Sequence, residues 1–317
     1  MPNRLKFMTI DDFYSNIELF NDPFEGKKIY CDEIKQRLNS SLIKRLISPI
    51  YAPLSYKMLM SGKRLGEPYT KFFTEANTGV IQHENKFRDL YGLLNDDKSR
   101  RTLLCILAYR LTGNIHLYRN ESDFLFKQYF DNYIVDLSKS EIFVDCGGYN
   151  GDTTEMFINL THEFSKVYFY EPDKQNYSKA IQYLREWNEN KFDKIVFRNY
   201  GVGKTNQQLG FSDGANSVSC ISDKSEYKIQ VVSLDSDIQD HITLIKMDIE
   251  GFEKEALEGA KRHISIDHPK LAICVYHKPD DLWEIPLLIK EYYPEYKLYL
   301  RQYGSGWWPN ETVIYAI

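Results

Sequence analysis

The stretch FVDCGGYNGDTT, residues 143–154, decides the fold of this chain. An apolar run ends in the carboxylate of Asp145, a glycine-rich turn follows, and an amphipathic segment with Met156 and Phe157 comes next. This order predicts a buried strand, a tight loop and the start of a helix, the arrangement with which α/β proteins hold nucleotides. Glycine lets the backbone approach a ligand without a Cβ in the way, and a helix N-terminus offers free N–H groups.

The spacing of this loop fits two nucleotide-binding templates, each with one mismatch. In the dinucleotide pattern G-x-G-x-x-G, Cys146 stands where the first glycine should be. In the D-x-G-x-G-x-G loop of S-adenosylmethionine (SAM) methyltransferases, Asp145, Gly147 and Gly151 fit, and Tyr149 replaces the middle glycine. The loop alone therefore leaves three alternatives: a nicotinamide cofactor, SAM, and a strand-to-helix turn that binds no ligand.

A second apolar strand ends in another carboxylate. The segment KVYFYEP, residues 166–172, brings Glu171 to the strand tip, and Pro172 suits the first turn of a new helix. An acidic side chain placed one βαβ unit after the glycine loop can accept hydrogen bonds from a ribose diol. Both SAM and NAD carry this diol, so Glu171 predicts a ribose ligand without separating the two.

Strands and helices alternate from residue 142 onward, which predicts a doubly wound, mostly parallel sheet. We expect strands near 142–146, 167–171, 195–200, 244–248 and 271–276, and helices near 153–164, 174–188, 252–264 and 281–292. Two last strands, near 296–301 and 311–316, should form a hairpin through Gly304-Ser305-Gly306 and give the sheet an antiparallel edge. Residues 203–235 suggest a β-hairpin insertion.

The first part of the chain has helical periodicity and no series of strands. We therefore expect a helical accessory domain at 1–125 and an α/β domain at 126–317. Asp96 and Asp97 are suited to cap a helix that buries several leucines, and Gly113 is suited to end it. The leucines and isoleucines of this region predict the core of a helix bundle and carry no chemistry.

Beyond the loop, the chain resembles the FkbM family of SAM-dependent methyltransferases. The resemblance rests on the loop D-x-G-x-x-x-G-D-T at 145–153, Glu171-Pro172, Ser233-Leu234-Asp235, the string K-x-D-x-E-G-x-E at 246–253 and the stretch 276–286, and it covers about residues 125–317. It implies a class I methyltransferase domain with a Rossmann-like sheet of seven strands. It also implies methyl transfer from SAM, usually to a hydroxyl oxygen of a sugar, a glycan or a polyketide-type natural product.

The cofactor has an expected place along the carboxyl ends of the strands, where such sheets bind ligands. We expect the methionine part of SAM, or of the product S-adenosylhomocysteine, near the loop, the ribose on Glu171, and the adenine near Tyr200. Tyr129, just before the first strand, could fold over the cofactor or belong to the core. The expected cofactor residues are Asp145, Gly147, Gly148, Tyr149, Gly151, Asp152, Thr153, Glu171, Pro172, Tyr200, Gly201, Val202, Asp248 and Tyr129.

The acceptor hydroxyl must lose its proton as the methyl group moves. His277, which follows an apolar strand, is our candidate general base, supported by Asp248 or Glu250, with a pKa near neutrality. If His277 is structural, the role passes to one of these two carboxylates. Carboxylates could hold Mg²⁺ against a diol, but we expect no metal because no dedicated ligand cluster is visible.

Composition excludes several other classes. The net charge of −5 argues against a nucleic-acid partner, and no apolar run of about 18 residues predicts membrane insertion. We expect no secretory segment, and the five cysteines include no C-x-x-C pair, so the expected location is the cytoplasm. The alternatives are an NAD(P)-dependent oxidoreductase and a non-catalytic SAM-binding scaffold. The sequence does not indicate an oligomeric state.

Overall fold

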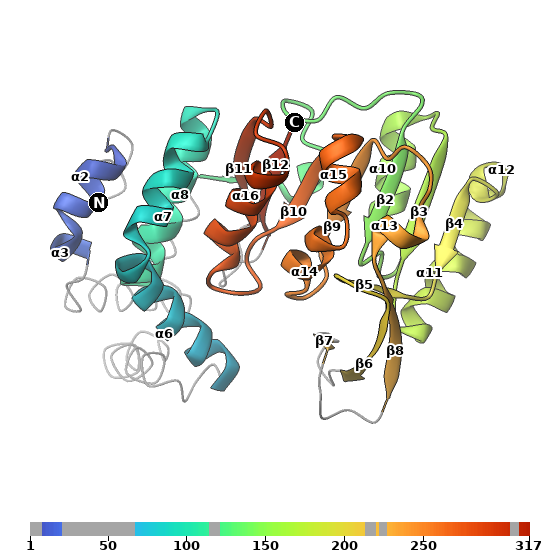
Figure 1. Cartoon of the computed structure of the whole chain (residues 1–317). Helices are drawn as coiled ribbons and strands as arrows, with labels where there is room; N and C mark the ends of the chain where they lie inside the picture. Colours follow the sequence, from blue (N-terminus) through green and yellow to red (C-terminus); the bar gives the residue numbers. More distant parts are fainter. Residues whose placement is uncertain (1–7, 21–66, 114–120, 213–219, 222–226, 305–310) are drawn as a thin grey trace, which may run out of the picture. The chain divides into compact units, whose positions relative to one another are not determined.

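The computed structural model describes residues 8–20, 67–113, 121–212, 220–221, 227–304 and 311–317 (Figure 1). The chain divides into two compact units. The first, here called the helical unit, comprises Met1–Phe124, Lys278–Trp283 and Leu300–Asn310. The second, the sheet unit, comprises Leu125–His277, Glu284–Tyr299 and Glu311–Ile317.

The helical unit is built largely of helices in its described part. These are α2 (Ile10–Ser15), α3 (Ile17–Phe20), α6 (Glu67–Gln82), α7 (Glu84–Leu93) and α8 (Asp97–Thr112). The predicted capping of α8 is confirmed. The side chain of Asp96 accepts the N–H of Ser99 at 2.7 Å, and the helix ends at Gly113, whose φ of 67° is left-handed.

Two later segments also belong to the helical unit, although our sequence division places all of 126–317 in the second domain. Arg301 Nη2 lies 2.6 Å from Asp96 Oδ2, and the N–H of Leu300 donates to Ser99 Oγ at 2.9 Å. Arg110 Nη1 donates to the carbonyl of Pro279 at 2.7 Å. The helical unit is therefore not a purely N-terminal domain, because it also contains two segments from the C-terminal part of the sequence.

The main sheet confirms the predicted class I methyltransferase topology. Its strand order is β1-β11-β12-β10-β9-β2-β3-β4, with β2 parallel to β3 and β9, β3 parallel to β4, β10 parallel to β9, and β12 antiparallel to β10. Seven of these strands were predicted: β2 (Ile142–Cys146), β3 (Lys166–Tyr170), β4 (Ile195–Arg198), β9 (Leu244–Met247), β10 (Lys270–Cys274), β11 (Leu298–Tyr303) and β12 (Thr312–Ala316). The prediction of seven strands misses an eighth, the two-residue β1 (Ser122–Asp123), which pairs with β11. The turn predicted between β11 and β12 lies mostly outside the described residues.

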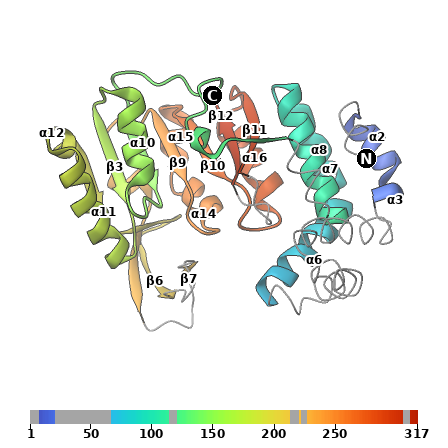
Figure 2. The same cartoon turned by 180° about the vertical axis from the view of Figure 1, so that it is seen from behind.

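Helices cover both faces of this sheet. Figures 1 and 2 show α10 (Asp152–Thr161) and α11 (Lys174–Trp187) on one face, and α15 (Lys261–Ile266) and α16 (Asp281–Tyr292) on the other. The remaining short helices are η1 (Leu125–Lys127), α12 (Glu189–Phe192), α13 (Leu234–Asp237) and α14 (Glu253–Glu258). None of the described helices has the length and apolar character needed to cross a bilayer.

The single helix predicted at 252–264 is wrong, because the structure divides it into α14 and α15. A Cβ on Gly259 would lie 2.0 Å from the carbonyl oxygen of Gly203, so the backbones meet here. The carboxylate of Asp235 then accepts the N–H groups of Arg262 and His263 at 2.8 and 3.2 Å, which starts the second helix.

A second, small sheet has the order β5-β8-β6-β7 and confirms the predicted hairpin insertion. Its strands are β5 (Gly201–Val202), β6 (Gln207–Ser212), β7 (Cys220–Ile221) and β8 (Lys228–Val232), with β6 antiparallel to β8. Phe211, Ile229 and Val231 form its buried cluster. The insertion places this apolar cluster next to the strand ends that were predicted to bind the cofactor.

Candidate active site

A cavity of about 740 Å³ in the sheet unit collects most of the predicted site residues. It lies where β2, β3 and β9 end, as expected for ligands of a doubly wound sheet. The predicted residues that line it are Tyr129, Gly147, Tyr149, Asp152, Thr153, Glu171, Pro172, Tyr200, Gly201, Val202, Asp248 and Glu250. The others are not among the residues that line it: Asp145, Gly148, Gly151 and His277.

The glycine loop is tied to both neighbouring strands. The N–H groups of Gly147 and Gly148 both donate to the carbonyl of Tyr170 at 3.0 Å. A Cβ on Gly147 would lie 1.9 Å from the carbonyl oxygen of Asp248, and one on Gly148 would lie 2.1 Å from the Phe169 ring. These glycines therefore allow the close approach of three strand ends, and Gly147 also contributes to the cavity wall.

The start of α10 is less available to a ligand than we expected. The N–H of Asp152 donates to Asn150 Oδ1 at 3.2 Å, and that of Thr153 donates to the carboxylate of Asp152 at 2.7 Å. Tyr149, in place of the middle glycine of the SAM template, has a left-handed φ of 48°. The template has glycine at this position because the backbone is left-handed there. Tyr149 adopts the same conformation, which strains its backbone.

Asp145 supports the loop from behind the cavity. Its Oδ1 lies 3.1 Å from Lys246 Nζ and its Oδ2 accepts the hydroxyl of Thr154 at 2.8 Å. Asp145 and Lys246 are directly opposite each other on β2 and β9, and both are almost fully buried. Lys246 also donates to the carbonyl of Gly147 at 2.7 Å. Asp145 is fully buried and is not among the residues that line the cavity, so its contacts position the loop, and a direct contact with the cofactor stays a prediction.

Glu171 presents a buried carboxylate to the cavity. Its Oε2 accepts the N–H of Tyr149 and its Oε1 accepts the N–H of Asp173, at 2.9 and 2.8 Å. Burial raises the pKa of Glu171 to about 7, opposed by these two N–H donors. Each carboxylate oxygen keeps a second lone pair, so the side chain can accept further hydrogen bonds from a diol.

Two tyrosines orient Asp248 at the opposite end of the cavity. The hydroxyl of Tyr129 donates to Asp248 Oδ2 at 2.7 Å, and that of Tyr276 donates to Oδ1 at 3.2 Å. We expected Tyr129 either to contact the cofactor or to belong to the core. In the structure it is buried and also lines the cavity. Asp248 therefore has a fixed direction before any ligand binds.

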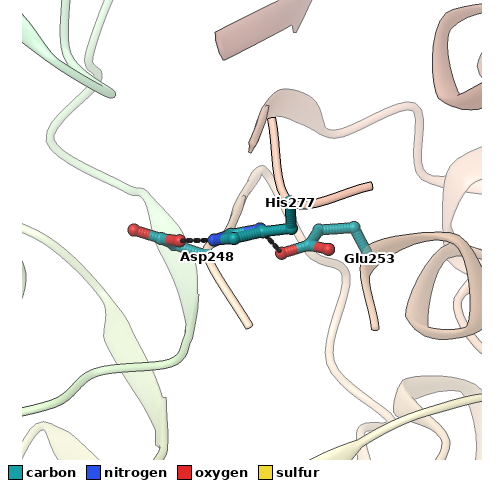
Figure 3. Close-up of side chains that lie close together, drawn as sticks. All are labelled: Asp248, Glu253 and His277. Carbon is teal, nitrogen blue, oxygen red and sulfur yellow. Dashed lines mark ion pairs between the residues drawn. The ribbon is translucent and has the colours of Figure 1, made fainter. Parts of the chain in front are cut away.

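His277 lies between carboxylates behind this end of the cavity. Figure 3 shows its ring between Asp248 and Glu253, with Nδ1 2.8 Å from Glu253 Oε1 and Nε2 3.3 Å from Asp248 Oδ1. Nε2 is also 3.6 Å from Glu250 Oε2. The His277 side chain is 8% exposed and is not among the residues that line the cavity, whereas Asp248 and Glu250 are.

The expected titration of His277 near neutrality is corrected by these neighbours. Burial lowers the pKa of the imidazole, but the carboxylates, Glu253 foremost, outweigh burial and raise the pKa to about 10. The ring is therefore cationic at pH 7 and has no free lone pair for a proton. Whether His277 takes part in catalysis stays a prediction, and the raised pKa opposes the role of a neutral general base near pH 7.

Backbone strain concentrates in the cavity wall. Four of the six described non-glycine residues with positive φ line it: Tyr129 (68°), Tyr149 (48°), Glu250 (55°) and Glu311 (69°). Such conformations cost about 1–3 kcal/mol each and persist where the surrounding structure enforces them. Their position in one cavity supports its assignment as the functional site.

The family model of the methyltransferase FkbM domain matches residues 145–305. The chain belongs to the FkbM methyltransferase family. The crystal structure of methyltransferase FkbM from Methylobacillus flagellatus KT is 30% identical to it, with a TM-score of 0.68. The match covers 77% of this chain and 61% of that one, so the chain spans less than two thirds of this relative.

Two other solved structures are similar to part of this chain. An rRNA methylase from Streptococcus thermophilus is 17% identical over 57% of this chain and 87% of its own, with a TM-score of 0.34. Fibrillarin from Aeropyrum pernix, in complex with natively bound SAM, is 8% identical over 58% and 70%, with a TM-score of 0.37. Neither similarity bears on function at this distance. No curated protein matches the sequence.

Several residues of the FkbM-family site had no signal in the sequence. Phe211 and Ile229 enter the cavity wall from the hairpin insertion, and Glu311 enters it from the segment before β12. Glu253 was part of the family string, but its contact with His277 was not foreseen. From the sequence, a glutamate at the start of a helix is expected to cap that helix. Its contact with His277 becomes visible only in the folded chain.

Proposed function

We propose that this FkbM-family chain transfers a methyl group from SAM to a hydroxyl oxygen of a sugar, a glycan or a natural product. One observation carries the proposal: the glycine loop, the Glu171 carboxylate and the carboxylates of Asp248 and Glu250 share the wall of one cavity. When bound, SAM supplies an electrophilic methyl group on its sulfonium. The chain supplies the binding, the alignment and the proton acceptor.

The described residues fit this cofactor. The cavity volume falls within the range of about 300–1,000 Å³ that ligand pockets usually have. Gly147 lets the loop lie directly against the end of β9, because a Cβ there would lie 1.9 Å from the carbonyl oxygen of Asp248. Glu171 offers carboxylate oxygens for a ribose diol, and the apolar Val202, Phe211 and Ile229 support a flat base nearby.

The acceptor end of the cavity carries the groups that can receive a proton. Asp248 and Glu250 both line it, whereas the His277 ring lies behind them and adds positive charge. A hydroxyl held against either carboxylate would be oriented by its hydrogen bond and could transfer its proton along that bond. Tyr129 and Tyr276 hold Asp248 in place for this task.

Calorimetry with S-adenosylhomocysteine and NADH tests the cofactor assignment. We expect S-adenosylhomocysteine to bind with one site per chain and NADH not to bind at millimolar concentration. An assay of S-adenosylhomocysteine release on a panel of glycans and polyols then tests turnover. Binding of NADH without binding of S-adenosylhomocysteine would replace the proposal with an oxidoreductase. Cofactor binding without turnover on any hydroxyl acceptor would favour a scaffold.

A further inference from the structure

We propose that His277 and Glu253 are positioning residues, which keep the Asp248 carboxylate ionised and directed for one acceptor hydroxyl. Glu253 is the first residue of α14, Asp248 directly follows β9, and His277 lies beyond the end of β10. The inference deepens the proposed function and rests on it only for the presence of a hydroxyl acceptor. The arrangement of the three side chains rests on the structure (Figure 3).

Both nitrogens of the His277 ring face carboxylate oxygens. Nδ1 lies 2.8 Å from Glu253 Oε1, and Nε2 lies 3.3 Å from Asp248 Oδ1 and 3.6 Å from Glu250 Oε2. A neutral imidazole has a proton on only one nitrogen, so its other nitrogen would turn a lone pair toward a carboxylate. The geometry therefore favours the doubly protonated ring, which can donate toward a carboxylate on each side.

Glu253 holds the ring on the side away from Asp248, as Figure 3 shows. Its side chain is fully buried, and its Oε1 also accepts the N–H of Ile249 at 2.8 Å. Ile249 is the residue after Asp248, so Glu253 ties the ring to the same strand end that carries Asp248. A buried carboxylate is stable in its ionised form only with a partner, and His277 provides one.

The donors around Asp248 leave its carboxylate one open position. Oδ1 faces His277 Nε2 and accepts the hydroxyl of Tyr276 at 3.2 Å, while Oδ2 accepts the hydroxyl of Tyr129 at 2.7 Å. Gln128 Nε2 donates to the Tyr129 oxygen at 3.1 Å, which leaves the proton of the tyrosine for Asp248. A carboxylate can accept about four hydrogen bonds. Oδ2 therefore has room for one more donor, and Asp248 lines the cavity.

The cation at position 277 is surrounded by acidic groups. The tyrosine next to it in the sequence packs against it, with 4.1 Å between the ring centroids. The groups near the imidazole that carry charge or can gain it are Glu253, Asp248, Glu250, Glu311 and Tyr276. The ring is therefore the positive group that offsets the repulsion among these carboxylates.

The charge of Asp248 depends on this cation. Burial raises the pKa of Asp248, but His277 and then Lys246 outweigh burial and lower the pKa below its usual 3.8. Lys246 is paired with Asp145 at 3.1 Å. Without the imidazolium, Asp248 would more readily take up a proton, and a protonated carboxyl group cannot accept another from a hydroxyl.

In methyl transfer, the ionised Asp248 would both orient the acceptor hydroxyl and receive its proton. The bond from the acceptor oxygen to the methyl carbon forms while the carbon–sulfur bond breaks and leaves its electron pair on sulfur. The hydroxyl proton passes to Asp248 Oδ2. Because the oxygen becomes positive as it gains the methyl group, a weak base such as a carboxylate is sufficient. Glu250 has no hydrogen bond to the described residues, so its carboxylate is less well directed for this task.

Nuclear magnetic resonance of the full chain, with ¹⁵N-labelled histidine and ¹³C-labelled aspartate, tests both charges. The signals of His277 and Asp248 are assigned by their loss in His277→Gln and Asp248→Asn. We expect both ring nitrogens of His277 to carry protons at pH 8, because the carboxylates raise the pKa of the ring to about 10. In Glu253→Gln the ring should lose its proton at a lower pH. In His277→Gln the titration midpoint of Asp248 should shift to a higher pH.

Two further variants separate the effect of charge from that of packing. His277→Lys keeps a cation at this position and should return the Asp248 midpoint toward that of the unaltered chain. Glu258→Gln, on the same helix as Glu253, removes a carboxylate that pairs with Lys204 at 3.1 Å, and it should leave both signals unchanged. Thermal unfolding first checks that each variant is folded. If His277→Gln is unfolded, His277→Lys assigns the ring signal, and the comparison with Glu253→Gln still decides the outcome.

Three results would overturn the proposal. These are a neutral His277 ring in the unaltered chain at pH 8, an unshifted Asp248 midpoint in folded His277→Gln, and equal effects of Glu253→Gln and Glu258→Gln on the ring.

The first glycan or polyol that gives release of S-adenosylhomocysteine tests the role in the reaction. In His277→Gln the loss of turnover toward acid should begin at a higher pH, with the KM for SAM little changed, and His277→Lys should reverse this shift. An unshifted profile in folded His277→Gln would contradict the role. Because the titrations use the chain without ligands, a failure of the proposed function is seen separately, in the calorimetry and the turnover assay.

Discussion

At the scale of a single residue, Glu171 is subject to two opposed effects. Its burial favours the neutral acid and raises its pKa to about 7, while a ribose diol needs the ionised form as a hydrogen-bond acceptor. Nearby Asp173 raises this pKa further, and Lys246 lowers it. The usual value is 4.5, so between these values the folded chain binds more protons than the unfolded chain, and rising pH lowers the stability of the free protein.

A bound cofactor should favour the ionised form of Glu171, and Glu171→Ala should abolish the resulting pH dependence of cofactor binding. We expect the affinity for S-adenosylhomocysteine to fall as the pH drops through about 7, because the carboxylate becomes protonated. The variant should bind about 1–3 kcal/mol more weakly at pH 8, with a much flatter pH profile. Calorimetry at several pH values measures both effects. An unchanged profile in the variant would mean that Glu171 does not contact the ligand.

Gly147 is a second residue whose identity is set by its surroundings. Its φ of 78° and the carbonyl of Asp248, 1.9 Å from where a Cβ would lie, leave no room for a side chain. We expect Gly147→Ala to unfold at a clearly lower temperature and to lose cofactor binding, because two strand ends must separate.

Gly92 provides the matched control for this substitution. It lies within α7, and a Cβ there would meet no atom within 4 Å. Gly92→Ala should stabilise the chain by up to about 1 kcal/mol through helix propensity alone. A similar loss of stability in both variants, measured by denaturant unfolding, would contradict the steric explanation for Gly147.

At the scale of the element, α8 depends on its first residue outside the helix. Asp96 caps the helix through Ser99 and pairs with Arg301. Burial would raise its pKa, but Arg301 and Ser99 prevail and lower it from 3.8 to about 2. The stabilisation from this charge is therefore present above about pH 4 and is lost as the pH falls toward 2.

Two substitutions separate the cap from the charge. Asp96→Ala removes both and should cost about 0.5–2 kcal/mol for the cap alone. Asp96→Asn keeps an oxygen for the N–H of Ser99 and should cost less, and it should lose less stability than the unaltered chain as the pH falls from 4 to 2. Urea unfolding at pH 7 and pH 3 provides the comparison. If both variants lose the same free energy of unfolding at pH 7, the ion pair with Arg301 accounts for the whole contribution of Asp96 and the cap contributes nothing.

The elements that could be predicted are those whose signals are local. The bounds of β2 and the cap and end of α8 follow from apolar runs and capping residues within the segment itself. The division between α14 and α15 could not be predicted in this way, because it arises where Gly259 meets Gly203. A contact between residues far apart in the chain leaves no periodicity to detect.

For the site residues, the sequence predicts the position of several side chains correctly, but it does not predict which groups they contact. The strand-end rule brought Glu171 and Asp248 to one cavity correctly, because it depends only on topology. It could not show that Asp145 pairs with Lys246, or that His277 lies between carboxylates. Those roles depend on register and side-chain direction, which are properties of packing.

At the scale of the whole molecule, the helical unit takes segments from both halves of the sequence. Asp96 and Ser99 contact Arg301 and Leu300, and Arg110 contacts Pro279. These contacts bury charged and polar groups that would lose their partners if the N-terminal helices were removed. Such losses typically cost about 1–3 kcal/mol for each unsatisfied group.

A shortened chain of residues 125–317 should therefore be much less stable than the full chain. We expect a lower unfolding temperature and aggregation at concentrations where the full chain stays dispersed, even though the cavity residues are all retained. Thermal unfolding with light-scattering detection makes the comparison. If the shortened chain unfolds at the same temperature, the N-terminal segment is dispensable for the fold.

The left-handed residues of the cavity wall have a consequence for protein engineering. Replacing Tyr129, Tyr149, Glu250 or Glu311 by glycine would relieve backbone strain while removing a side chain that shapes the cavity. Directed evolution that selects only for heat resistance would accept such changes at exposed positions such as Tyr149. Libraries built on this scaffold should therefore keep these four codons fixed, or apply a second selection for ligand binding.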